Sequence, residues 1–265
     1  MKIKKLLPFI AFLPLLGACH HIDEDETLIP VEKQPLQRNV LLEEFTGQMC
    51  VNCPDAHEEI EKLVKQYGDK LIVVSVHALE GQFGISVDDG GLMQPEGDMY
   101  ADHWKITALP CGVVDGQNSV LTYDQWNTAI RRAGAIASNM ELSLDAELSG
   151  DGKTINIKSD LFADRAVTGN FQLWVVEDGL VAQQRIPTGR IPNYVHNNVY
   201  RASVNGLWGE PVDLKANQSW TFENSIAMHI DQEEEIDNWN PDNLYIVGFV
   251  YNSSEVLVVE KTKVK

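Results

Sequence analysis

The sequence predicts an α/β domain at residues 38–138 followed by an all-β sandwich at residues 139–265. In the first part, two apolar runs typical of buried strands flank one pattern with helical spacing. In the second part, apolar and polar residues alternate with the period of two expected of strands. The chain has 265 residues, 44% of them hydrophobic and 23% charged, which fits a globular protein with two domains.

The first 18 residues are expected to be an export signal. Three of the first five residues are lysines, and residues 6–16 are mostly apolar but too few to span a bilayer. The run ends in Leu-Gly-Ala before Cys19 and resembles the lipobox of bacterial lipoproteins, which implies fatty acyl chains such as palmitate on Cys19. The alternative is an ordinary signal peptide, which also ends in small residues.

Residues 19–37 are predicted to form an acidic tether. The run from Asp23 to Glu26 resembles the tag that carries some lipoproteins to the cell surface, and a solvated spacer is the alternative. The whole chain has a formal net charge of −18. This charge argues against binding to nucleic acid or to anionic lipid head groups, and it leaves cationic or neutral partners.

The expected elements of the first domain place a C-x-x-C motif between a strand and a helix. Cys50 and Cys53 follow the first strand and directly precede the helix at residues 54–67. The unpaired N–H groups at a helix N-terminus stabilise a thiolate. The motif alone allows a static disulfide, half of a zinc site or a cycling dithiol. Further elements are expected as a strand at 71–77, a helix near 98–104, a strand from Pro110, and a helix from the capping box at Thr122.

Residues 38–138 resemble a thioredoxin fold, with the C-x-x-C after the first core strand and a proline before the third. The resemblance implies that Cys50 is the exposed attacking thiol, that Cys53 resolves the mixed disulfide, and that Pro110 is cis and lies beside both. It also implies that Glu44 is a buried acid that relays a proton to Cys53. An exposed carboxylate at the strand end is the alternative for Glu44.

Two segments are similar to motifs of the outer-membrane lipoprotein family named for a twenty-eight-kilodalton outer membrane protein. They are the run from Leu41 to Pro54 and the run from Tyr194 to Arg201. The family implies an outer-membrane location and leaves the reaction open. Two departures from the thioredoxin pattern stand out: Val51-Asn52 separates the cysteines, and Cys111 follows the proline, which would bring a third thiol near the pair.

A zinc site of three cysteines and either His57 or His103 is a weaker alternative. The chain has no second C-x-x-C and no H-x-x-H motif, so we predict no metal and no cofactor.

In the second domain, a hairpin is expected at residues 140–158 around the turn Ser149-Gly150-Asp151-Gly152. Further strands are expected at residues 171–176, 220–222, 226–230, 245–251 and 256–259. We expect the aromatic side chains of these strands to be interior: Trp174, Trp220, Phe249 and Tyr251.

The segment from Arg185 to Gly209 interrupts the alternation and collects arginine, histidine and asparagine. It could contact the first domain or a ligand, and arginines that satisfy buried carbonyl groups are the simpler explanation. The acidic residues between 231 and 242 lack the spacing of a known calcium loop and are predicted to be a solvated connection.

Two functions remain in view. The first is a lipid-anchored thiol–disulfide oxidoreductase that exchanges disulfides with exported proteins through Cys50 and Cys53. The second is a surface binding or scaffold lipoprotein in which Cys50–Cys53 is a permanent structural bridge.

Overall fold

The computed structural model describes residues 36–265. The predicted signal peptide, Cys19 and most of the acidic tether therefore lie outside the described residues. None of the helices within residues 36–265 has the length and apolar character that a membrane crossing needs.

The first half of the described chain forms the elements that its sequence pattern predicts. Strand β1 (Val40–Thr46) and strand β2 (Leu71–His77) are buried along their whole length and pair in parallel. Helix α1 (Cys53–Tyr67) connects them, with Pro54 in its first turn and a buried stripe that includes Ala56, Ile60 and Leu63. These residues form the predicted strand, helix and strand because each pattern is local and strongly periodic.

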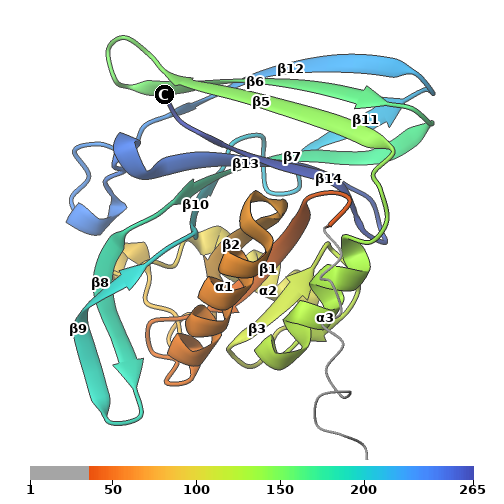
Figure 1. Ribbon diagram of the computed structural model, residues 1–265. Coiled ribbons are helices and arrows are strands. Elements are labelled where there is room, and N and C mark those ends of the chain that lie inside the picture. Colours follow the sequence, from red (N-terminus) through yellow and green to blue (C-terminus); the bar gives the residue numbers. More distant parts are fainter. Residues whose placement is uncertain (1–35) are drawn as a thin grey trace, which may run out of the picture. The chain divides into compact units, whose positions relative to one another are not determined.

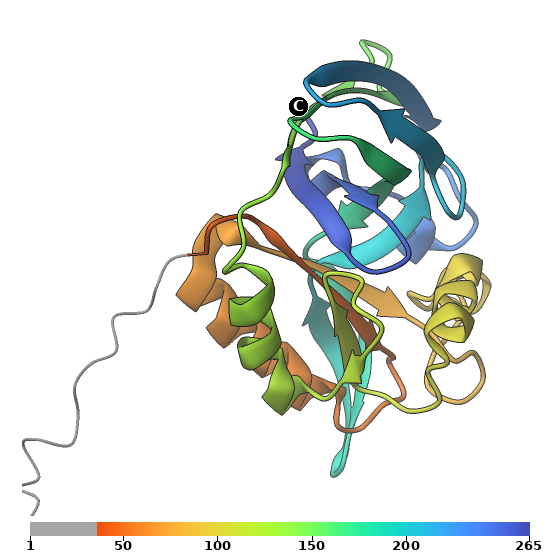
Figure 2. The ribbon, with the colours of Figure 1, turned by 90° about the vertical axis from the view of Figure 1, so that its right-hand side faces the viewer.

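The remaining elements of this half surround β1 on two faces. Helix α2 (Pro95–Trp104) precedes strand β3 (Cys111–Val114), which pairs antiparallel with β1. Strand β4 (Val120–Leu121) and helix α3 (Tyr123–Ala133) follow, and α3 begins with the predicted capping box. Figure 2 shows α1 and α3 on one face of strands β1 to β3 and α2 on the other.

The strands of the second half continue the same sheet. These strands are β7 (Val167–Glu177), β10 (Val199–Ser203), β11 (Glu210–Leu214), β13 (Leu244–Tyr251) and β14 (Val256–Lys263). The sheet has nine strands in the order β14-β13-β7-β10-β2-β1-β3-β4, with β11 also pairing with β7. The two halves meet in this sheet where β10 pairs in parallel with β2 (Figure 1). This pairing places Val199 beside Ser75.

A second sheet covers part of the first. It consists of β12 (Gln218–Ala227), β6 (Thr154–Ala163) and β5 (Met140–Leu148), in that order. An apolar core joins it to the larger sheet and includes Ile157, Phe171 and Ile246. The two further strands, β8 (Leu180–Ile186) and β9 (Gly189–His196), pair with each other as a hairpin that extends past α1 in Figure 1.

The predicted fold class is wrong. The structure does not contain a separate thioredoxin-like α/β domain followed by an all-β sandwich. Residues 36–265 are mostly β-structure and form one compact unit, in which strands from both halves share one sheet. Sequence periodicity identifies strands but not their partners, and β10 covers the edge of β2 that a separate domain would leave open.

Other differences from the sequence reading concern single segments. Residues 185–209 contain β9, β10 and the end of β8 rather than an irregular stretch, and the strands expected at 220–222 and 226–230 are one strand, β12. Among the aromatic residues expected inside, Trp174 and Phe249 are buried, but Trp220 is 39% exposed and Tyr251 is half-buried.

Candidate disulfide site

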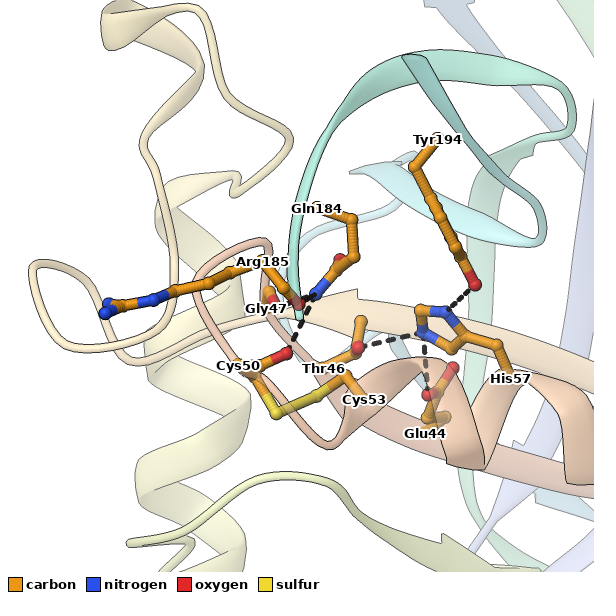
Figure 3. Close-up of a disulfide and its surroundings, with 9 residues drawn as sticks. All are labelled: Glu44, Thr46, Gly47, Cys50, Cys53, His57, Gln184, Arg185 and Tyr194. Atoms are coloured by element: carbon orange, nitrogen blue, oxygen red, sulfur yellow. Dashed lines mark hydrogen bonds and ion pairs between the residues drawn. A yellow bond between two sulfur atoms is a disulfide. The ribbon is translucent and has the colours of Figure 1, made fainter. Parts of the chain in front are cut away.

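Cys50 and Cys53 form a disulfide between the end of β1 and the start of α1 (Figure 3). Backbone hydrogen bonds shape this loop: the N–H of Cys50 donates to the carbonyl of Gly47 at 3.0 Å, and the N–H of Met49 donates to that of Phe83 at 2.8 Å. Helix α1 begins at Cys53, so Cys50 lies just before the helix, as predicted. The expectation that Cys50 is exposed is wrong, because its side chain is only 2% accessible.

The loop after β2 packs tightly on the turn that leads to Cys50. A side chain at Gly47 would place its Cβ 2.6 Å from the carbonyl oxygen of Phe83. That approach is shorter than any real carbon–oxygen contact, so glycine is required there. The segment after β2 that contains Phe83 therefore lies directly against the loop of the disulfide site.

The peptide bond between Leu109 and Pro110 is cis, and Cys111 follows it as the first residue of β3. Cys111 lies opposite Phe45 of β1 and belongs to the same apolar cluster as Cys50 and Cys53. Its thiol is free. Burial, reinforced by the nearby Glu44 carboxylate, raises the pKa of Cys111 to about 12. Cys111 is therefore a neutral thiol rather than a nucleophile in this arrangement.

Glu44 is fully buried, so the alternative of an exposed strand-end carboxylate is wrong. The Ser75 hydroxyl donates to its Oε2 atom, and Nε2 of His57 lies 3.2 Å from its Oε1 atom. His57 also lies 3.0 Å from the Thr46 hydroxyl and, through Nδ1, 2.9 Å from the Tyr194 hydroxyl (Figure 3). The carboxylate is thus held between a hydroxyl donor and an imidazole.

The electrostatics of His57 reflect two opposed effects. Burial disfavours the imidazolium, but the adjacent Glu44 carboxylate favours it more, and the net result is a raised pKa for His57. His57 lies four residues after Cys53 on the same helix, so the two side chains share one face of α1. The imidazole of the Glu44–His57 pair therefore lies one helical turn beyond Cys53 on α1.

The hairpin of β8 and β9 covers the disulfide loop. The side-chain amide of Gln184 donates to the carbonyl of Cys50 at 2.9 Å and to that of Gly47 at 3.3 Å. The backbone N–H of Arg185 donates to the carbonyl of Gln48 at 2.7 Å, whereas the Arg185 side chain points away from the cysteines (Figure 3). Gln184 was missed by sequence reasoning, because nothing in its local pattern indicates a contact with the C-x-x-C loop.

A polar cavity of about 420 Å³ lies beside Glu44 and His57, between α1, β2 and β9. Its lining includes His77 and His196, whose rings lie 5.4 Å apart. Burial lowers the pKa of His196 to about 3 and that of His77 well below its usual value, so both rings are neutral. The motif from Tyr194 to Arg201 therefore contributes two side chains, Tyr194 and His196, to the surroundings of Glu44.

The described residues do not form the zinc site that was considered as an alternative. Within residues 36–265, no three donor side chains lie close enough together to hold a metal ion. Cys50 and Cys53 are joined to each other, His57 is paired with Glu44, and His103 contacts Trp104 and Trp208 instead.

The segment from Arg185 to Gly209 contacts the first half of the chain, one of the two roles expected for it. Its most buried arginine, Arg201, lies 3.5 Å from Glu177 and donates to the carbonyl of Ile236 at 2.8 Å. These contacts match the simpler explanation, in which arginine satisfies buried acceptors.

The geometry defines a β-rich protein with a buried disulfide, a cis-proline and a third thiol in the same apolar cluster, and a covering hairpin. Residues 97–265 match the family model described as outer membrane protein Omp28. Because the match spans more than half of the chain, this protein belongs to the Omp28 family of outer membrane proteins. The family resemblance seen in the sequence is confirmed, and the C-x-x-C motif lies before the matched region.

One solved structure shows the same fold at low sequence identity, and a second aligns less well. HBP35 of Porphyromonas gingivalis aligns with 86% of this chain and 76% of its own, at 15% identity and a TM-score of 0.68. Protein AGR_C_4864 from Agrobacterium tumefaciens aligns with 86% of this chain and 94% of its own, at 12% identity and a TM-score of 0.49. No curated protein matches this chain.

Proposed function

We propose that this protein is a lipoprotein, anchored in the outer membrane through Cys19, whose Cys50–Cys53 pair exchanges disulfides with exported proteins. The observation that carries the proposal is the disulfide beside the N-terminus of α1, with His57 one helical turn beyond Cys53 and paired with the buried Glu44. A helix N-terminus stabilises the thiolate that exchange requires, and a carboxylate–imidazole pair can carry the proton.

The exchange begins from the oxidised pair. A substrate thiolate attacks Sγ of Cys50 and forms a mixed disulfide, while Cys53 leaves as a thiolate and takes up a proton from the Glu44–His57 pair. A second substrate thiolate then attacks the substrate sulfur of the mixed disulfide and releases Cys50. The substrate dithiol is thereby oxidised to a disulfide, and the two cysteines are reduced and end with its two protons. The reverse sequence reduces a substrate disulfide.

Access to Cys50 requires the segments around its loop to move, and the β8–β9 hairpin is one of the segments held to that loop. Gln184 and the backbone of Arg185 hold the hairpin to the loop through hydrogen bonds, and a neutral hydrogen bond contributes only about 1 kcal/mol net. Opening the strand ends nearest the cysteines is therefore compatible with exchange on a biological timescale. Its substrate would be a flexible segment that replaces these backbone contacts.

Insulin reduction and the refolding of scrambled ribonuclease test the exchange. The protein is expected to accelerate at least one of the two reactions, and Cys50→Ser is expected to lower that rate at least a hundredfold. Cys53→Ser is expected to trap a mixed disulfide with a substrate protein. It would be visible on a non-reducing gel as a band that disappears when a thiol reductant is added. Cys111→Ala is the matched control and keeps the rate. Equal rates for the wild-type protein and Cys50→Ser would reject the exchange.

The lipid anchor has its own test. Cells fed labelled palmitate are expected to label the wild-type protein but not Cys19→Ala, and the variant is expected to leave the membrane fraction. A membrane-bound, unlabelled wild-type protein would reject the anchor. Surface exposure through the acidic run at residues 23–26 is tested by protease treatment of intact cells, with the run replaced by serine and asparagine as the control.

The complete burial of the disulfide favours a second function, a binding or scaffold lipoprotein in which Cys50–Cys53 is a structural bridge. The two functions differ in reduction potential, because structural bridges in exported proteins generally have potentials below about −300 mV.

A further inference from the structure

A second cavity, of about 600 Å³, shares no lining residue with the disulfide site. It lies between β1, the end of α2, β7, β13 and the loop that precedes β14. Six aromatic rings line it: Tyr100, Trp104, Trp174, Trp208, Phe249 and Tyr251. Several of these rings meet edge to face, with Tyr100 contacting both Trp174 and Trp208 at centroid distances of 5.2 and 5.4 Å. The cavity is thus a preformed aromatic pocket of the size that binds small ligands.

Two buried side chains of the pocket, Glu43 and Gln172, carry acceptor oxygens. The Glu43 carboxyl is 5% exposed, and the Gln172 side chain is 1% exposed. Within residues 36–265, atom Oε1 of Gln172 has no hydrogen-bond partner, whereas its Nε2 atom faces three acceptors, the nearest being the carbonyl of Gly206 at 2.9 Å. These three neighbours fix the orientation of the amide. A buried acceptor without a donor is unfavourable unless a ligand supplies one.

Most donors of the aromatic lining are already used within the protein. Trp174 donates to the Tyr100 hydroxyl at 3.0 Å, which in turn donates to the carbonyl of Leu207 at 2.8 Å. The Tyr251 hydroxyl donates to the carbonyl of Trp208 at 2.8 Å, and Trp104 forms a hydrogen bond with Glu43. None of the described residues that line the cavity is a lysine or an arginine.

We propose that this cavity binds an organic cation, an alkylammonium or guanidinium group, that donates to Glu43 and Gln172 and lies against the aromatic rings. Cations are attracted to the faces of tryptophan and tyrosine rings, most strongly where water is excluded. The formal charge of −18 on the chain attracts such a group from solution. The group can belong to a free amine or to a lysine or arginine side chain of a peptide.

The ionisation of Glu43 links this binding to pH. Burial raises the pKa of Glu43 to about 7, partly offset by the hydrogen bond from Trp104, and Asp115 raises it further. The other titratable groups that face the pocket are His103, Tyr100 and Tyr251. Burial raises the pKa of both tyrosines, which stay neutral. A bound cation favours the ionised carboxylate, so affinity rises with pH between about 6 and 8 and binding releases a proton.

The test is titration of the full-length protein with four probes, followed by tryptophan fluorescence and calorimetry. The probes are butylammonium, arginine methyl ester, the peptide acetyl-Gly-Arg-Gly-amide and its glutamine counterpart. The three cations are expected to bind and the glutamine peptide is not. Binding of the arginine peptide alone would assign the group to a peptide side chain, and equal binding of the free amines would assign it to a small molecule.

Two variants and two controls connect the binding to the pocket. Glu43→Gln is expected to lower the affinity for the cations at least tenfold and to abolish the proton release on binding. His103→Asn is its control and is expected to keep the proton release. Trp208→Ala removes a 41% exposed ring of the pocket and is expected to lower the affinity for the cations about fivefold. Its control is Trp220→Ala, which removes a 39% exposed ring outside the pocket and leaves the affinity unchanged. Unchanged affinity in both pocket variants, no cation binding at millimolar concentration, or tighter binding of neutral glucose or cellobiose would overturn the proposal.

Discussion

Glu43 and Glu44 are neighbours in β1. Their carboxyl groups lie on opposite faces of the sheet and contact different kinds of side chain. Glu44 faces His57 of α1, and its Oε2 atom accepts a hydrogen bond from the Ser75 hydroxyl of β2. Glu43 faces the aromatic pocket, where Trp104 donates a hydrogen bond to it and burial raises its pKa to about 7. The comparison teaches that strand alternation alone gives adjacent acids different chemistry: a paired carboxylate beside the disulfide and an open acceptor in a pocket.

Removing the paired carboxylate is expected to have the largest effect. Glu44→Ala leaves His57 and the Ser75 hydroxyl without their acceptor in a buried setting, which is expected to lower the free energy of unfolding by about 4 kcal/mol at pH 7. Urea denaturation measures this value. Glu141→Ala, which removes an exposed carboxylate from β5, is the matched control and should change stability by less than about 0.5 kcal/mol. Similar values for both variants would show that the Glu44–His57 pair does not contribute to the free energy of unfolding.

The open carboxyl group is expected to make stability depend on pH. Between its ordinary pKa of 4.5 and its folded value of about 7, Glu43 keeps a proton that the unfolded chain has lost. The unfolded state therefore binds fewer protons, and this group lowers stability by about 3 kcal/mol as the pH rises from 4.5 to 7. Glu43→Gln should remove that part of the decline in denaturation curves measured across this range. Parallel pH profiles for the two proteins would contradict the raised pKa.

The hairpin contact gives an intermediate effect. Gln184→Ala removes the side-chain amide that holds β8 to the carbonyl of Cys50, so the disulfide should be reduced by dithiothreitol about tenfold faster. Arg190→Ala, which removes an exposed bond to Gln183 on the same hairpin, is the control and should keep the wild-type rate. Unchanged reduction in Gln184→Ala would mean that the hairpin does not limit access.

The smallest expected effect is a shift in one titration. NMR of the histidine rings should show His57 titrating above its ordinary pKa of 6.5, whereas His77 and His196 stay neutral from pH 5 to 8. Because the folded pKa of His57 is raised, its contribution to stability is present below 6.5 and is lost as the pH rises through the folded value. Glu44→Gln should lower the pKa of His57, because it removes the adjacent carboxylate that favours the imidazolium. An unchanged His57 pKa in that variant would contradict the ion pair.

The sequence predicted much of the first half of the fold because its signals are local. Val40 to Thr46, Leu71 to His77 and the helix between them have strong periodicity, and the capping box at Thr122 marks a helix start. The pairing of Val199 with Ser75 joins residues more than a hundred positions apart, and no local pattern encodes it. The predicted division into two separate fold types was wrong for this reason.

Several residues of the candidate site could likewise be named from the sequence. The residues Cys50, Cys53, Pro110 and Glu44 come from motifs near one another in the chain or from the resemblance. Sequence reasoning considered His57 only as a zinc ligand, although its spacing from Cys53 was visible. Gln184 and Glu43 were missed because their roles depend on a hairpin and a pocket that exist only in the folded chain.

The most direct test of the exchange site is the reduction potential of the Cys50–Cys53 disulfide, measured by equilibration of the purified protein with glutathione and dithiothreitol buffers. The proposed exchange predicts a value between about −270 and −120 mV, within the range of known thiol–disulfide oxidoreductases. A value below about −300 mV would contradict it and assign the disulfide a purely structural role.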